Sequence, residues 1–285
     1  MMVLFLELLK PKIIFGNLIS CLGGFLLASK GNIHYNFLFL NLIGISLIVG
    51  SSCILNNVID YKLDKQMSRT KNRILVTNVC YYNLAIYFAI FLGILGLFTY
   101  GYFINILCML FALLGFIIYV IFYSLYLKKR SIYSTVIGSI SGAIPPVLGY
   151  CSVTNYIDLC AINLFIVLMF WQIPHSYAIF LMHLNDYKHA NIPIFPIVKS
   201  FLVTQYHIKI CILLFLIFSC FFTVMHFTGY KFFFSILVLS IVWFYLAFKT
   251  YDDDKNHIIW SKNIFYHSII IMLVMNIMMA IDCVS

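Results

Sequence analysis

Nine predominantly apolar runs, each long enough to cross a lipid bilayer as a helix, divide this chain of 285 residues. Only 9% of the residues are charged, whereas about 25% are charged in an average soluble domain. A soluble fold keeps much of its surface in water and has no way to hide this much apolar surface. The sequence therefore predicts an all-α polytopic membrane protein, built as one domain over residues 1–285. The spans are expected at 13–29, 37–58, 79–99, 103–127, 132–150, 158–181, 206–228, 232–250 and 263–282.

Basic residues are distributed unevenly between the two ends of these spans. Sixteen of the 18 Lys and Arg residues lie before the first span or after spans two, four, six and eight, and only Lys30 and Lys231 lie on the other side. The positive-inside rule places the 16 in the cytoplasm of a bacterial inner membrane and the carboxyl terminus outside. This topology and attraction to anionic lipids account for the net charge of +9, so no nucleic-acid partner is predicted.

The second span ends in an unusual ladder of polar side chains. Asn56, Asp60 and Asp64 recur every four residues, which places all three on one face of a helix. Two neighbouring carboxylates repel each other near lipid, and a divalent cation offsets that cost. Carboxylate and amide oxygens suit Mg²⁺, which usually shares its site with substrate phosphates. The alternative is a helix end that snorkels into water beside a positive loop. The loop that follows Asp64 carries three basic residues whose side chains suit phosphate oxygens: Arg69, Lys71 and Arg73.

A second group of polar residues lies in and after the sixth span. The segment 171–177 places an imidazole, His175, and a proline, Pro174, at membrane depth, where such residues are either functional or hydrogen-bonded to a neighbouring helix. Asp186 and Lys188 follow, 126 residues after Asp60 and Lys62. This offset predicts that spans one to four and five to eight are related halves, with the ninth span extra.

Three further segments have simpler interpretations. The glycines and prolines of the fifth span, among them Gly142, Pro145 and Gly149, favour close helix approach or a broken helix beside a cavity. The basic stretch 128–130 is first a topology signal, although it is also placed to reach an anionic group at the same membrane face. The acidic stretch 252–254 is interpreted as a solvated loop, because consecutive residues point in different directions on a helix.

Two acidic clusters on one membrane face, with basic residues beside them, suit a lipid whose head is a diphosphate. A diphosphate held by Mg²⁺ and by Arg and Lys side chains is also a good leaving group. Its loss from an allylic chain produces a carbocation inside an apolar cavity. The residues thus favour prenyl transfer.

These motifs resemble those of the UbiA-type intramembrane prenyltransferases, whose first signature, N-x-x-x-D-x-x-x-D, reads Asn56, Asp60, Asp64 here. Within that superfamily the chain is similar to the branch that farnesylates protoheme IX. The similarity lies in segments 57–73, 171–178, 186–187 and 191–193, in Lys10–Pro11 and in 142–146. One departure is that Ala190 stands where many members carry the second acid of a D-x-x-x-D motif.

The resemblance implies nine helices around a central cavity and a Mg²⁺-dependent transfer of farnesyl from farnesyl diphosphate to a vinyl group of heme b. Water addition would complete the product, which would serve a heme–copper oxidase or another heme-handling partner. The catalytic residues it implies are Asp60, Asp64, Asp186 and His175. The implied metal ligands are Asn56, Asp60, Asp64 and Asp186, and the implied substrate-binding residues are Asn56, Arg69, Lys71, Arg73, Gln172, Tyr187 and Lys188.

Two other functions remain open at this point. A UbiA-type enzyme acting on an aromatic quinone precursor would share the first motif but leave the segment 171–177 without a role. A secondary transporter would use paired halves and polar residues at mid-membrane. The acidic residues gather at one face and form no path across the membrane, which disfavours a transporter.

Overall fold

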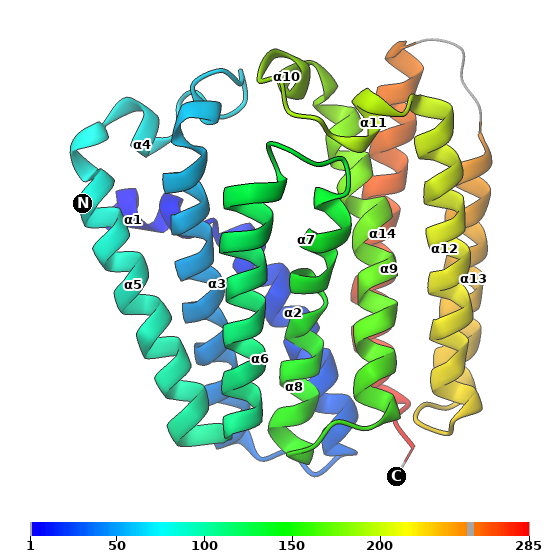
Figure 1. Cartoon of the computed structure of the whole chain (residues 1–285). Helices are drawn as coiled ribbons and strands as arrows, with labels where there is room; N and C mark the ends of the chain where they lie inside the picture. The colour runs from blue at the N-terminus through cyan, green and yellow to red at the C-terminus, as the bar shows by residue number, and fades with distance from the viewer. Residues whose placement is uncertain (1, 250–253, 285) are drawn as a thin grey trace.

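The computed structural model describes residues 2–249 and 254–284, and nearly all of them belong to helices that run side by side (Figure 1). Nine helical segments of the described residues are long and apolar enough to span a membrane, as the sequence predicts. The helices are α1 (Met2–Leu9), α2 (Pro11–Ser29), α3 (Tyr35–Asp64), α4 (Ile74–Thr77), η1 (Val79–Tyr81), α5 (Tyr82–Phe98), η2 (Thr99–Ile104), α6 (Ile106–Ile117), η3 (Ile118–Leu127), α7 (Ser134–Gly142), α8 (Ile144–Thr154), α9 (Leu159–Met182), α10 (Leu184–His189), α11 (Phe195–Val198), α12 (Phe201–Val224), α13 (Tyr230–Phe248) and α14 (Asp254–Ile281).

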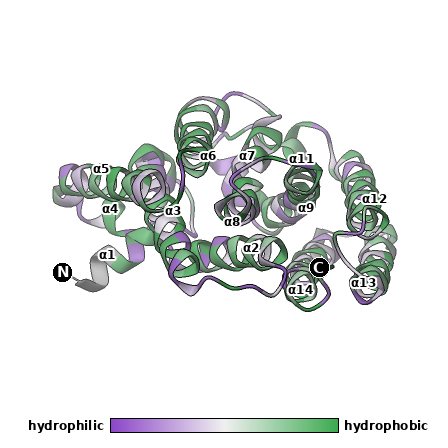
Figure 2. Ribbon diagram, turned by 90° about the horizontal axis from the view of Figure 1, so that it is seen from below, coloured by the Kyte–Doolittle hydropathy of each residue, from purple (hydrophilic) through white to green (hydrophobic). Residues whose placement is uncertain are grey.

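The outside of this bundle is apolar, as a lipid-facing surface must be. Large side chains such as Phe15, Tyr87, Ile94 and Phe234 are exposed on it, and the ribbons seen along the bundle are mostly hydrophobic (Figure 2). In water an apolar surface of this extent would drive aggregation. The chain is therefore a multi-pass membrane protein.

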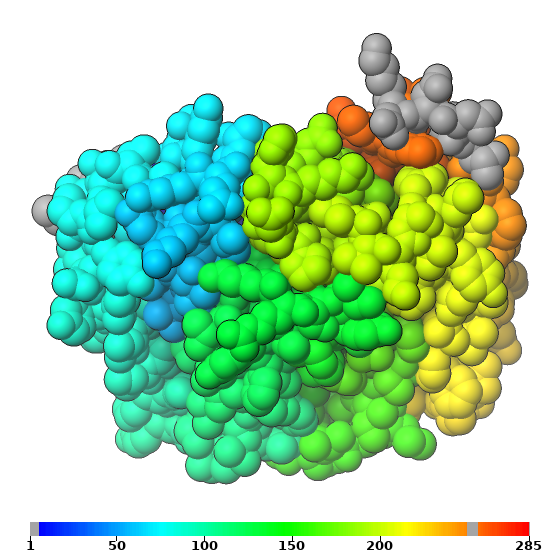
Figure 3. Space-filling model, turned by 45° about the horizontal axis from the view of Figure 1, so that its top comes forward, coloured from blue at the N-terminus to red at the C-terminus, as the bar shows by residue number. Residues whose placement is uncertain are grey.

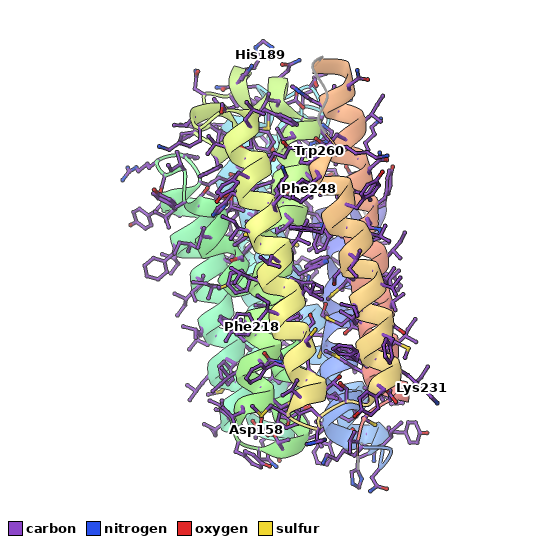
Figure 4. All side chains as sticks on the ribbon, turned by 90° about the vertical axis from the view of Figure 1, so that its right-hand side faces the viewer. Asp158, His189, Phe218, Lys231, Phe248 and Trp260 are labelled. Carbon is purple, nitrogen blue, oxygen red and sulfur yellow. The ribbon has the colours of Figure 1, made fainter. Side chains whose placement is uncertain are left out.

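The loops after spans two and six and the carboxyl terminus lie at opposite ends of the bundle (Figure 1), as the charge pattern predicts. The short helices α4, α10 and α11 lie at one end, and the carboxyl terminus lies at the other (Figure 1). A side view places His189 at the first end, with Asp158 and Lys231 at the second (Figure 4). The polar loops after spans two and six thus share one end of the molecule.

Several helices begin or end away from the positions expected from the apolar runs. The helix of the second span continues through the polar ladder to Asp64, so Asn56, Asp60 and Asp64 occupy one uninterrupted helix. The ninth helix begins at Asp254, well before the apolar run, because Trp260 is buried and donates a hydrogen bond to the Leu246 carbonyl. Of the stretch 252–254, expected as a solvated loop, Asp254 is instead the first residue of α14, and 252–253 lie outside the described residues.

The fifth span is broken, and it also makes the close helix contact that its glycines favour. It consists of α7 and α8, which meet at Ala143, with Pro145 in the first turn of α8, where a proline sacrifices no helical hydrogen bond. On α8, Gly149 lies so close to α2 that a Cβ built there would be 1.9 Å from the Cys21 carbonyl oxygen. This contact fixes α2 against α8, beside the cavity described next.

Candidate active site

A cavity of about 850 Å³ opens inside the bundle, with polar side chains at the end where α4 and α10 lie. Its walls come from α2, α3, α6, η3, α7, α8, α9, α10 and α14, and most of its surface is apolar. This position matches the central cavity that the sequence led us to expect. The predicted site residues that line it are Asn56, Asp60, Asp64, Arg69, Arg73, Gln172, His175 and Tyr187.

The ladder of α3 forms the polar end of the cavity, and each of its carboxylates contacts a cation. Asp60 forms an ion pair with Lys128, and Asp64 forms one with Arg73 at 2.7 Å. Asn56 donates its amide hydrogen to Asp60 at 2.8 Å, which is the contact expected between residues four apart on a helix. Both aspartates and Asn56 are buried, so these charges interact with little screening by water.

Lys10 and Ser124 also belong to this cluster, although the sequence interpretation gave neither a role. Lys10 donates to the Asn56 side-chain oxygen at 2.7 Å, and the Asn56 amide also reaches Ser124 at 3.2 Å. The Lys10 backbone is left-handed (φ 52°) where α1 gives way to α2, which turns its side chain toward α3. The sequence signals for Lys10 were its place among the 16 basic residues of one membrane face and its pairing with Pro11, and neither points to Asn56.

Lys128 comes from the topology signal after the fourth span, and a change of helix type brings it to the site. The last ten residues of that span, η3, form a π-helix, and the Lys128 amide bonds to the Tyr123 carbonyl five residues earlier. Such π-turns recur at functional sites because they shift side chains around the helix axis. Sequence periodicity carries no signal for this shift.

The pKa values of the two lysines shift in opposite directions, because their charged neighbours differ. Burial, with the nearby charge of Arg73, lowers the pKa of Lys10 to about 8. Burial also disfavours the charge of Lys128, but the carboxylate of Asp60 outweighs it and raises the pKa of Lys128 above its usual value. Lys128 therefore stays cationic near neutral pH.

The loop after the sixth span reaches the loop after the second span through Asp186. Its Oδ1 accepts hydrogen bonds from the Ser68 hydroxyl at 2.7 Å and the Ser68 amide at 3.1 Å, and its Oδ2 accepts one from the Arg69 amide at 3.3 Å. The Ser68 hydroxyl is the main cause of a lowered pKa for Asp186. The structure thus joins the loops after the second and sixth spans, although Asp186, Lys71 and Lys188 are not among the residues that line the cavity.

His175 lies on the wall formed by α9 and α14. Its ring stacks on Trp171 (centroids 4.7 Å apart) and packs on Phe265 (4.9 Å). Its Nδ1 lies 2.8 Å from the Ser268 hydroxyl. Because that hydroxyl donates to the Phe265 carbonyl at 2.6 Å, it accepts from Nδ1–H, which leaves the Nε2 lone pair available to a ligand. The His175 ring is therefore held in one orientation and one tautomer.

Gln172 lies one residue from Trp171 on the same wall, and a glycine makes room for it. A Cβ built on Gly142 of α7 would lie 3.0 Å from the Gln172 side-chain amide. The wall around His175 therefore combines aromatic rings with the amide of Gln172, which also lines the cavity.

The carboxylate end also fits a magnesium ion that carries a phosphate. Asp60 Oδ1 is buried and has no hydrogen-bond partner, so it offers a lone pair to a cation. Within residues 2–249 and 254–284, no three Asp, Glu, His or Cys side chains gather as a metal site. A hard cation held by Asp60 and Asp64 would thus take its remaining oxygens from a substrate and from water, as Mg²⁺ commonly does.

Comparison with known proteins identifies the family. The model of the UbiA prenyltransferase family matches residues 17–269. The chain belongs to this family. Among its curated relatives is a protoheme IX farnesyltransferase of Buchnera aphidicola, 48% identical over 96% of this chain and 95% of the relative. A protein of the same name from Yersinia pseudotuberculosis is 44% identical over 98% of this chain and 94% of the relative.

Solved structures of the family share this fold. A digeranylgeranylglyceryl phosphate synthase superposes with a TM-score of 0.80 at 18% identity and covers 98% of both chains. A UbiA homolog from Archaeoglobus fulgidus, bound to DMAPP and Mg²⁺, superposes with a TM-score of 0.72 at 16% identity, over 94% of this chain and 98% of the homolog. The all-α bundle with nine apolar helices is therefore the architecture of UbiA-type intramembrane prenyltransferases.

Proposed function

We propose that this protein transfers a farnesyl group from farnesyl diphosphate to a vinyl group of heme b and adds water, which gives heme O. The observation that carries the proposal is that one cavity joins the buried Asp60–Lys128 and Asp64–Arg73 pairs to the wall formed by His175 and its aromatic neighbours. Relatives named protoheme IX farnesyltransferase, at 42–48% identity, support the choice of substrates.

The diphosphate belongs at the carboxylate end in this proposal. Asp60 and Asp64, with Asn56 beside them, would hold Mg²⁺, which neutralises charge on the diphosphate oxygens. Arg73 and Lys128 then supply hydrogen-bond donors and positive charge where the leaving oxygen becomes negative. Arg69, at the same end of the cavity, is placed to contact the outer phosphate. Lys71 and Lys188 are exposed and do not line the cavity. In this proposal they do not contact the diphosphate and only attract the anionic head group toward the site.

The farnesyl chain and the heme belong in the apolar part of the cavity. Loss of diphosphate leaves an allylic cation, whose C1 bonds to the terminal carbon of the heme vinyl group. The positive charge moves to the vinyl carbon next to the porphyrin, where water adds and a proton is lost. The walls exclude water from the first cation, which favours attack by the vinyl group over hydrolysis. The product is a heme of the type used by a heme–copper oxidase, our proposed downstream partner.

The proposal is tested by incubating purified protein in lipid nanodiscs with farnesyl diphosphate, heme b and Mg²⁺, and by analysing the extracted hemes by mass spectrometry. We expect a heme whose mass has grown by one farnesyl group and one hydroxyl group, because the added water loses one proton. Removal of Mg²⁺ with EDTA is expected to stop its formation. Unmodified heme, with prenylation of an aromatic quinone precursor supplied in parallel, would instead favour the quinone branch of the family.

His175 provides a separate prediction for the heme side of the site. We propose that its Nε2, or its N–H in the charged form, contacts the heme iron or a propionate. His175→Ala is expected to weaken heme binding about tenfold or more, a loss of about 1.4 kcal/mol, and to leave the binding of farnesyl diphosphate unchanged. Heme titration followed by the Soret band measures the first quantity, and binding of labelled farnesyl diphosphate measures the second. A matched His183→Ala variant is expected to bind heme as the parent does.

The orientation is proposed on the charge pattern. We place the protein in a bacterial inner membrane, with the cavity's polar end at the cytoplasmic face and the carboxyl terminus outside. Alkaline phosphatase fused to the carboxyl terminus is expected to be active, and an inactive fusion would reverse the assignment.

A further inference from the structure

Asp186 contacts the neighbouring loop through both of its carboxylate oxygens. Both of its oxygens accept hydrogen bonds from Ser68 and Arg69, and two of the three donors are consecutive backbone amides. A carboxylate bound by several N–H and O–H donors at once is an effective clamp for a loop, since bonds to a charged acceptor are the stronger ones. In the space-filling view, the segment around residues 65–73 and the segment that contains α10 meet at one face of the molecule (Figure 3).

The loop that Asp186 clamps is the one that carries arginines into the cavity. Arg69 and Arg73 both line it, and Arg73 pairs with Asp64. The loop is also folded on itself, since the Thr70 hydroxyl and amide bond to the carbonyls of Asp64 and Met67. Thr70 therefore holds the loop to the end of α3, and Asp186 holds it at Ser68 and Arg69.

The helix that carries Asp186, α10, packs against the bundle through the neighbouring residue. Tyr187, the next residue, is buried, lines the cavity and packs edge-on against Phe180 of α9 (centroids 5.0 Å apart). Ala190, where many family members have a second acid, is buried as well. The inner side of α10 thus forms part of the cavity wall, while Asp186 reaches outward to the arginine loop.

We propose that Asp186 is a positioning residue, which clamps the Ser68–Arg69 loop to α10 and so holds Arg69 at the mouth of the cavity for the diphosphate. This inference rests on the proposed function, because it takes the diphosphate to bind there. It assigns Asp186 a role different from the metal ligand that its motif suggests.

The clamp is tested in the full-length protein in nanodiscs with Asp186→Ala, Asp186→Asn and Ser68→Ala. Binding of labelled farnesyl diphosphate gives its affinity and the Mg²⁺ concentration for half-maximal binding. Limited trypsin digestion gives the cleavage rate within the loop, which contains Lys65, Arg69, Lys71 and Arg73. His189→Ala is the control, since His189 is exposed on the same helix (Figure 4).

We expect Asp186→Ala to weaken farnesyl diphosphate binding about tenfold, to speed cleavage of the loop severalfold and to leave the Mg²⁺ requirement within about twofold. Asp186→Asn keeps an acceptor oxygen, so its effects should be smaller. Ser68→Ala should reproduce part of the Asp186→Ala effect, and the double variant should be no worse than Asp186→Ala, because both act through one contact.

The opposite pattern would overturn the clamp. If Asp186→Asn and Asp186→Ala raised the Mg²⁺ requirement equally by tenfold or more, while Ser68→Ala changed nothing and loop cleavage kept its rate, Asp186 would be a metal ligand. These readouts need no heme. If the protein bound farnesyl diphosphate normally but formed no farnesylated heme, heme b would be the wrong acceptor. The clamp would still be tested by the binding of farnesyl diphosphate and by the rate of loop cleavage.

Discussion

Asp60→Asn is expected to lower the rate of farnesyl transfer about a thousandfold, the size of effect seen when one pre-aligned electrostatic contact is lost from a transition state. Asp60 is buried, pairs with Lys128, accepts from Asn56 and has one oxygen free for a cation. Asparagine has the same shape but carries no charge. It therefore removes the metal's anionic ligand and leaves the charge of Lys128 uncompensated.

The measurement is the amount of farnesylated heme formed per minute by equal amounts of folded protein. Asp158→Asn is the matched control, because Asp158 lies at the opposite end of the bundle (Figure 4) and caps α9 by accepting from the Ala161 amide. Asparagine caps helices about as well as aspartate, so this control should keep its rate within about threefold. A full rate in Asp60→Asn would refute the assignment of the metal site.

Gly149→Ala is expected to destabilise the whole bundle, by about 3 kcal/mol. The added methyl group would lie 1.9 Å from the Cys21 carbonyl oxygen and 2.8 Å from the Phe25 amide nitrogen. These are backbone atoms, which no change of rotamer can move aside. From the other side, a Cβ on Gly24 would lie 2.0 Å from the Pro146 carbonyl oxygen. α2 and α8 would have to separate along their shared surface.

Thermal unfolding in detergent, followed by the fraction that remains monodisperse after heating, measures this loss. Gly16→Ala is the control, because it lies in α2 with no atom within 4 Å of its would-be Cβ. Alanine favours a helix over glycine by about 1 kcal/mol, so this variant should unfold at the same temperature or higher. Equal stability of Gly149→Ala and the parent would contradict the close packing of α2 on α8.

Much of the site was predictable because its residues are neighbours in the sequence. Asn56, Asp60 and Asp64 share a helix face by their spacing, and the structure places all three at the cavity. The basic residues of the following loop divide in a way that spacing does not reveal: Arg69 and Arg73 line the cavity, whereas Lys71 does not. The direction of a side chain in a loop depends on local turns, such as the one closed by Thr70.

Other members of the site come from distant parts of the chain. Lys128 belongs to a basic run whose obvious role is topology, and its approach to Asp60 depends on the π-helical end of the fourth span. Lys10 reaches Asn56 because the chain turns through a left-handed residue between two helices. Neither the π-helix nor the left-handed turn leaves a periodic pattern, so neither was predictable.

The sequence by itself determined that this chain crosses a membrane nine times and that a polar ladder ends its second span, since apolar length and four-residue spacing are local properties. It also carried the motifs of the UbiA family. Only the tertiary structure decided which cation faces each carboxylate, that Asp186 binds the arginine loop, and that His175 is oriented by Ser268 of α14. Arg73 lies nine positions after Asp64 and is turned back toward it by the fold of the loop. The other contacts join residues 68 to 118 positions apart, and packing of helices, rather than the pattern within any one of them, brings such residues together.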